Sequence, residues 1–233
     1  MPAINTRWLV ALFGFFALLA SPSRAAVFDE FAPLYGLDLH WWRVKNSGHW
    51  DGMFVTNLVG TDVFIGAKFL ENLGFNFGYQ QTDKRVRSVF IPNNDPKAGD
   101  AINNTGGGVT VKTRVRVSGF FWDLIGYLPT ANGFEVFASI GSMWARSTVD
   151  IEPLQPINAP YLAGISSITG HHNQILRLNL GGIWMATDVV GLRAKIGWEG
   201  TSRLKITDNK GYGFKQKPFK DALMFGFGIF TYF

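Results

Sequence analysis

The sequence contains no cysteine among its 233 residues. A disulfide-stapled scaffold, a cysteine-ligated zinc site and a catalytic thiol are therefore all excluded. Charged residues are also scarce, at 17% of the chain, where soluble domains have about 25%. Hydrophobic residues make up 47% and aromatic residues 15%, a composition that excludes a disordered chain. What remains is a folded protein with much apolar and aromatic surface to place.

Long apolar runs are missing after the first 25 residues, so no later segment is typical of a membrane helix of about 20 residues. The one substantial run, residues 8–20, follows Arg7 and precedes Ser23, Arg24 and Ala25. A basic start, a short apolar centre and small residues before the cleavage point are typical of a secretory signal peptide. We therefore predict a cleavable signal peptide over residues 1–25 and export of the rest.

The basic charge of the chain weakens once this segment is removed. Arg7 and Arg24 leave with it, so 22 basic residues fall to 20 against 17 acidic ones, and the formal charge falls from +5 to +3. A nucleic-acid-binding protein normally carries a concentrated basic face. We predict no nucleic-acid partner.

Apolar and polar residues alternate with period 2 along the remaining chain, which indicates β-strands. The pattern predicts eight strands, over residues 34–43, 62–69, 73–82, 109–121, 134–145, 174–185, 190–200 and 221–233. The connections at 70–72, 123–133 and 186–189 are tight or moderate, whereas those at 44–61, 83–108, 146–173 and 201–220 are long and polar. In an up-and-down meander all long connections then lie at one end, as in bacterial outer-membrane barrels.

A soluble sandwich or lipocalin-like barrel shows the same alternation with its apolar face inside, but three features favour lipid outside. Glycines gather on the polar face, where the narrow interior of an eight-stranded barrel needs small residues. Aromatic residues of the apolar face form two groups near the strand ends, as at two membrane interfaces. The last strand alternates up to Phe233 and can pair with the first to close a barrel. The aromatic girdle residues are Tyr35, Phe69, Phe121, Phe134, Trp184 and Phe233 beside the short turns, and Trp41, Tyr79, Trp144 and Trp198 toward the long loops.

These features predict an all-β protein, a transmembrane eight-stranded antiparallel up-and-down β-barrel over residues 34–233. A short periplasmic segment, residues 26–33, separates it from the signal peptide. We expect a monomer in the outer membrane of a Gram-negative bacterium, in contact with outer-membrane lipid and lipopolysaccharide.

Three segments of the sequence resemble the OmpA-like and opacity-type family of small outer-membrane barrels. They are residues 35–42, 65–79 and 191–199. The resemblance covers nearly all of residues 33–233. It implies an outer-membrane barrel whose C-terminal strand is recognised by the barrel-assembly machinery. Thr231 stands where the family tends to have a hydrophobe two residues before the final Phe233, a departure that bears on this recognition.

The polar face of the predicted strands carries seven basic and three acidic residues. Buried charges must be paired or hydrated, and the tight turn at 186–189 places Arg177 nearly opposite Glu199, which predicts an ion pair. The interior is then a plugged, salt-bridged lumen; the alternative is a narrow, anion-preferring pore. The predicted lumen network is Asp38, Lys68, Lys112, Arg114, Arg116, Glu135, Arg177, Arg193, Lys195 and Glu199.

Basic residues also mark two of the long connections, where they could contact lipopolysaccharide phosphates or an anionic host surface. The alternative is a set of solvated loops. The candidate contact residues are Lys84, Arg85, Arg87, Arg203, Lys205, Lys210, Lys215 and Lys217.

Catalytic and metal-binding patterns are weak. Of the four histidines, His40 is predicted to face inward and His49, His171 and His172 lie in loops, so none is placed for a Ser-His-acid triad. His171 and His172 lack a convergent carboxylate for a metal. We predict no enzyme, no cofactor and no metal, but a structural or surface-interaction role in envelope integrity or loop-mediated adhesion, with an extracellular or host ligand at the long loops. The alternatives are a narrow porin-like ion channel and, third, a lipid-modifying enzyme.

Overall fold

The computed structural model describes residues 31–46, 52, 54–92, 109–130, 134–153, 168–170, 173–200, 206–208 and 219–233. The strands formed by these residues are β1 (Ala32–Asn46), β2 (Asn57–Leu70), β3 (Leu73–Thr82), β4 (Arg85–Ile91), β5 (Val109–Pro129), β6 (Phe134–Pro153), β7 (Ile168–Gly170), β8 (Asn173–Met185), β9 (Val190–Glu199), β10 (Ile206–Asp208) and β11 (Phe219–Tyr232). Within these ranges no helix is long and apolar enough to cross a membrane.

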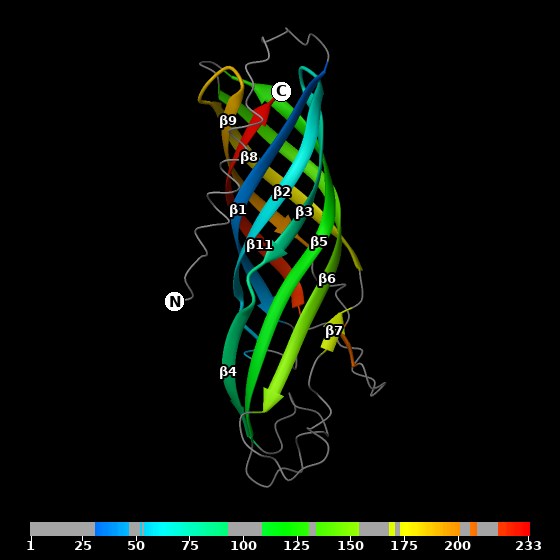
Figure 1. The fold of residues 1–233 in the computed structure, drawn as a ribbon, viewed down its shortest axis with the longest axis vertical. Coiled ribbons are helices and arrows are strands. Elements are labelled where there is room, and N and C mark those ends of the chain that lie inside the picture. Colours follow the sequence, from blue (N-terminus) through cyan, green and yellow to red (C-terminus); the bar gives the residue numbers. More distant parts are fainter. Residues whose placement is uncertain are drawn as a thin grey trace.

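Eight strands close into an antiparallel barrel in the order β1, β2, β3, β5, β6, β8, β9, β11 and back to β1 (Figure 1). The closing pair is β1 with β11, in register from Leu34 opposite Tyr232. Closure satisfies the backbone groups of both strands, as a lipid environment requires. The predicted eight-stranded up-and-down barrel is therefore confirmed, and its third strand has the predicted bounds, 73–82.

The barrel strands differ greatly in length, and this corrects three predicted connections. Residues 85–91 of the predicted loop 83–108 form β4, which pairs with β5, and residues 146–153 of the predicted loop 146–173 continue β6. The predicted turn at 123–133 is also wrong, because β5 continues to Pro129 opposite Glu135. Asp123 is buried inside the barrel, and Gly126 pairs with Ala138 of β6, so neither residue marks a turn.

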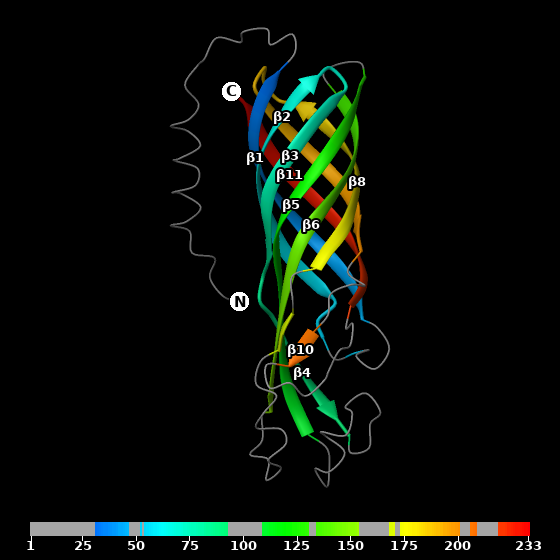
Figure 2. The same cartoon turned by 90° about the vertical axis from the view of Figure 1, so that its right-hand side faces the viewer.

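The two ends of the molecule are unlike. The β2–β3 and β8–β9 turns lie at the end that carries the C-terminus, whereas β4 and the distal parts of β5 and β6 project at the other (Figures 1 and 2). The predicted signal peptide lies outside the described residues. Of the predicted periplasmic segment, Ala32 and Pro33 belong to β1.

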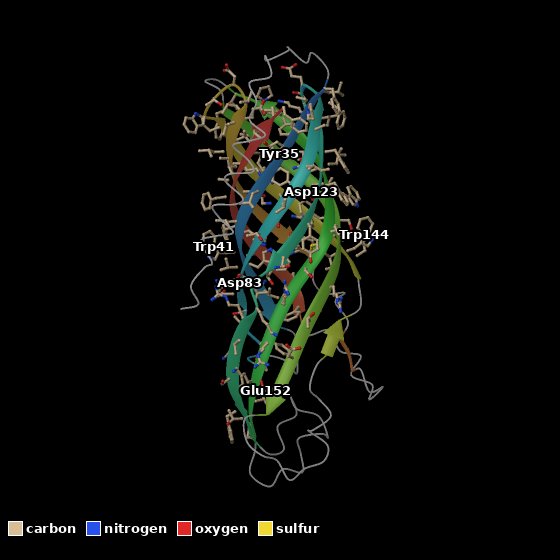
Figure 3. All side chains as sticks on the ribbon, in the orientation of Figure 1. Tyr35, Trp41, Asp83, Asp123, Trp144 and Glu152 are labelled. Carbon is tan, nitrogen blue, oxygen red and sulfur yellow. The ribbon has the colours of Figure 1, made fainter. Side chains whose placement is uncertain are left out.

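An apolar belt surrounds the barrel wall. Leucine, isoleucine, valine and phenylalanine side chains of alternate strand positions are exposed, among them Ile65, Leu180 and Phe227 at 54% to 63% of their surface. Soluble monomers do not expose contiguous apolar patches of this extent, whereas lipid requires them. Figure 3 shows Tyr35 near the short-turn end, and Trp41 and Trp144 farther toward the long connections. The apolar face of the barrel is therefore its lipid-facing face.

The predicted girdle residues lie on this outer face with one exception. Trp41, Tyr79, Phe134, Trp144, Trp184 and Phe233 are exposed, and Tyr35, Phe69 and Trp198 are partly exposed. Phe121 is buried inside the barrel, and it lies at the level of Trp144 toward the long connections and not beside a short turn. Phe120 is the outward-facing residue at this level, stacked on Phe77 with ring centroids 6.1 Å apart.

The error at Phe121 has a single cause, which also misplaced three charged residues. The alternation over residues 109–121 predicts that the valines at 111, 115 and 117 face lipid, but they are buried on the inner side of β5. Because this part of β5 lies beyond the apolar belt, its apolar side packs inward and its charged side faces water. Side chains alternate without interruption along β5, so Phe121 points to the same side as Val115 and Val117, which is the interior.

Candidate functional site: the charged lumen

The predicted interior placement of Lys112, Arg114 and Arg116 is wrong for the same reason. All three are on the outer side of β5, where Arg114 pairs with Glu152 of β6 at 2.7 Å. The other predicted network residues, Asp38, Lys68, Glu135, Arg177, Arg193, Lys195 and Glu199, face the lumen.

The lumen network has two groups of charged residues, which we call centres. The first centre is formed around Asp38 of β1. Arg193 of β9 donates to both of its carboxylate oxygens, from Nε at 2.7 Å and Nη2 at 2.6 Å. Lys195 Nζ lies 2.6 Å from Asp38 Oδ2 and 3.2 Å from Asp62 Oδ2. A bidentate guanidinium contact is among the strongest ion-pair geometries in proteins. Two bases and two acids are thus connected across β1, β2 and β9.

Arg177 of β8 holds the second centre. Its guanidinium lies 3.1 Å from Glu199 on β9, 3.4 Å from Asp62 on β2 and 3.7 Å from Asp123 on β5. The ion pair with Glu199 is the one that the turn register predicted, and the two residues are directly opposite in the β8–β9 pairing. His40 Nδ1 lies 3.3 Å from the other oxygen of Asp62. Asp62 therefore joins the two centres.

Aromatic rings support the buried cations. The Arg177 guanidinium lies 3.9 Å from the centroid of Phe121, and the Arg193 guanidinium lies 3.9 Å from that of Phe64. Such contacts stabilise a desolvated cation by about 2 kcal/mol. The inward position of Phe121 is thus part of the network.

Asp62 and Asp123 were missed from the sequence, and they change the charge balance. The described lumen of the barrel holds four bases, Lys68, Arg177, Arg193 and Lys195, and five acids, Asp38, Asp62, Asp123, Glu135 and Glu199. Asp62 is six residues before Lys68 on the same strand, so the two side chains point to the same face. Because Lys68 is predicted to face the lumen, this spacing could have placed Asp62 there as well. The excess of basic residues that favoured an anion-preferring pore is not present.

Apolar layers cover the network on both sides along the barrel axis. Toward the short turns it is followed by Leu34, Phe64, Ile125, Phe137, Ile183 and Phe230. Beyond these lies the ion pair of Lys68 and Glu135 at 2.7 Å. Toward the long connections it is followed by Trp42, Phe54, Leu58, Val117, Met143, Ile175 and Phe219, all buried. The lumen is a packed interior with a charged centre.

The predicted surface-contact residues are only partly described. Lys84, Arg85 and Arg87 are exposed at the start of the extension. Lys84 pairs with Asp150 at 3.0 Å, Arg85 with Asp83 at 3.7 Å, and Arg87 donates to the Phe54 carbonyl at 3.5 Å. Arg203, Lys205, Lys210, Lys215 and Lys217 lie outside the described residues, as do His49, His171 and His172.

No metal site is formed by the His, Asp and Glu side chains that the structure describes, taken in groups of three or more. His40 is buried in the lumen, away from the lipid-facing wall. What the two charged centres do together is cross-link the barrel strands β1, β2, β5, β8 and β9.

The fold is shared with solved outer-membrane proteins. The crystal structure of Neisserial surface protein A aligns with a TM-score of 0.54 and 13% identity, over 86% of this chain and 97% of that one. A major outer membrane protein from Thermus thermophilus aligns with a TM-score of 0.54 and 12% identity, over 87% and 99%. No protein-family model and no curated protein matches the sequence. The chain therefore has the fold of a small outer-membrane β-barrel, with an apolar outer belt of the kind that lipid requires.

Proposed function

We propose that the protein is a sealed, non-enzymatic barrel that anchors a surface-exposed β-sheet in the outer membrane, for adhesion or surface recognition and for envelope integrity. In this proposal residues 1–25 are removed on export, the barrel is a monomer inserted through recognition of β11, and the long connections face the cell exterior. The observation that carries it is the extension of β5 and β6 beyond the apolar belt.

The length of the extension follows from strand geometry. A membrane-spanning strand needs about 9–11 residues, and β3 and β9 have 10 each. β5 has 21 residues and β6 has 20. The surplus of about ten residues, at about 3.3 Å each, gives about 30 Å of paired strand outside the membrane. Regular pairing from Val111 opposite Pro153 onward holds it as a sheet. A barrel needs no such projection to span a bilayer, so we assign it to interaction at the surface.

The packed lumen opposes the alternative function, a narrow ion channel. An ion would have to cross the apolar layer at Trp42 and Phe54 and then break the contacts of Arg177. Both steps carry a high cost, because unhydrated ions and unpaired buried charges are strongly unfavourable. We expect purified protein in planar bilayers to show no stable conductance steps. Reproducible, large, ion-selective steps would support the channel instead.

The orientation of the sheet gives a second test. The chain has no native cysteine, so single substitutions report position without background. In intact cells a membrane-impermeant maleimide should label Glu152→Cys, on the extension, and leave Glu71→Cys, in the β2–β3 turn, unlabelled until the cells are lysed. Both side chains are exposed, so the contrast reports the membrane and not burial. The opposite labelling would overturn the proposed function.

A further inference from the structure

The outer side of the extension carries a group of four polar residues just above the apolar belt. Arg116 and Ser118 belong to β5, and Arg146 and Thr148 belong to β6. Arg116 is opposite Thr148, and Ser118 is opposite Arg146. All four have the strand phase of Phe120 and Trp144, which face lipid. We call these residues the β5–β6 quartet.

The aromatic pair next to the quartet shows where the quartet lies relative to the membrane. Phe120 is directly opposite Trp144, and the two side chains are 53% and 45% exposed. Figure 3 places Trp144 toward the long-connection end of the belt, with Glu152 much farther along β6. Large aromatic residues mark the level of lipid headgroups. Residues two and four positions beyond them along each strand therefore lie at the headgroup level.

The charges of the quartet differ from those farther out on the same side. Asp150 pairs with Lys84 at 3.0 Å and Glu152 pairs with Arg114 at 2.7 Å. Asp150 and Glu152 are thus paired with other bases. Arg116 and Arg146 have no acidic partner among the described residues. Both arginines are exposed. They are diagonal neighbours of one antiparallel pair, which lie about 7–8 Å apart, with their Cβ atoms somewhat closer.

We propose that the quartet binds a phosphate of the lipid A headgroup of lipopolysaccharide. Two long guanidinium side chains at this separation can converge on one phosphate, where the planar fork of arginine makes paired hydrogen bonds. Ser118 and Thr148, each directly opposite one of the two arginines, supply hydroxyl groups as further donors. The acyl chains then pack along Phe120 and Trp144. The inference rests on the proposed function, because it needs the extension to be on the lipopolysaccharide side of the membrane.

The test uses the full-length protein purified in detergent micelles and titrated with diphosphoryl lipid A, with bound lipid counted by native mass spectrometry. Basic residues at an anionic membrane surface contribute about 1 kcal/mol each. The variant R116Q/R146Q should therefore lose about 30-fold in lipid A affinity. The matched control K84Q/R114Q removes the same charge from residues that have acidic partners, and should lose less than threefold.

A second lipid separates phosphate recognition from other binding. Lipid A without phosphates should bind both variants and the wild type equally. A heat-dependent shift in gel mobility verifies that each variant is folded. Equal losses in R116Q/R146Q and K84Q/R114Q, no loss in R116Q/R146Q, or the same loss with dephosphorylated lipid A would each overturn the site. If Glu152→Cys is labelled from outside while one of these results is obtained, the site alone fails. If it is not labelled, the proposed function fails first.

Discussion

Replacing Arg177 with methionine is expected to lower the free energy of unfolding by about 3–5 kcal/mol. Methionine has a similar length and retains contact with Phe121, but it removes the positive charge. Asp62, Asp123 and Glu199 then lose the cation that lies within 3.7 Å of each of them. Arg177 and Glu199 are fully buried, so water cannot replace the lost contacts. The measurement is the urea dependence of folding into lipid vesicles, with the folded fraction read from gel mobility.

The control for Arg177→Met is Lys84→Met, which also breaks an ion pair, here between the β3–β4 connection and β6. Lys84 is 55% exposed in its pair with Asp150, and exposed pairs contribute at most about 1 kcal/mol. We expect this variant to stay within that range. A loss below 1 kcal/mol for Arg177→Met would show that water enters the lumen and hydrates the three acids. The lumen would then not be sealed, and the channel would become the better-supported function.

The fold could be predicted from the sequence because lipid imposes one rule on every spanning strand. Alternate positions must be apolar and the others must fit a narrow lumen. The alternation over residues 174–185 therefore predicts Leu178, Leu180 and Trp184 on the lipid side, and the structure confirms that these side chains are exposed. The register of the β8–β9 pair followed to within one residue: the tight turn predicts Arg177 nearly opposite Glu199, and the structure pairs them directly, with Met185 opposite Gly191. That register alone is sufficient to place Arg177 beside Glu199.

The extension could not be predicted by that rule, because the rule holds only where lipid is present. Beyond the apolar belt the outer side of the sheet faces water and not hydrocarbon. The apolar residues of β5 therefore face inward there, although the sequence alternates in the same way as in a lipid-facing strand. Val115 and Val117 therefore look identical to lipid-facing residues in the sequence. The length of β5 was the missing quantity, since a strand of 21 residues must leave a bilayer that needs about 10.

The lumen network was predicted in part for a related reason. Residues in the middle of well-defined strands, such as Asp38 and Lys195, were assigned by phase alone. Asp62 stood at the first position of a predicted strand that in fact begins at Asn57, and Asp123 stood in a predicted turn. Acidic residues near strand ends are usually solvated, so these positions do not by themselves predict burial. Only the tertiary contact with Arg177 shows that they are buried.

The second large effect is expected from valine in place of Gly119 of β5, which should destabilise the barrel by about 1–3 kcal/mol or more. Gly119 faces the interior, directly opposite Ala145. A Cβ atom at this position would meet the carbonyl oxygen of Trp144, and would lie 2.9 Å from the Trp144 carbonyl carbon and 3.0 Å from the Ala145 Cα. These are backbone atoms of β6, so they cannot move aside without disturbing the β5–β6 pairing that carries the extension.

Gly126→Val is the matched control, because it makes the same change on the same strand. Gly126 is on the outer face, and the nearest atom to a new Cβ is the Ala138 carbonyl oxygen at 3.9 Å, an ordinary contact. A β-branched residue suits a lipid-facing strand position, so we expect a change within about 0.5 kcal/mol. The same urea titration in vesicles measures both variants. Equal destabilisation by the two would show that glycine is needed in β5 for its backbone and not for the narrow interior, and the assignment of Gly119 to the packed side of the strand would be wrong.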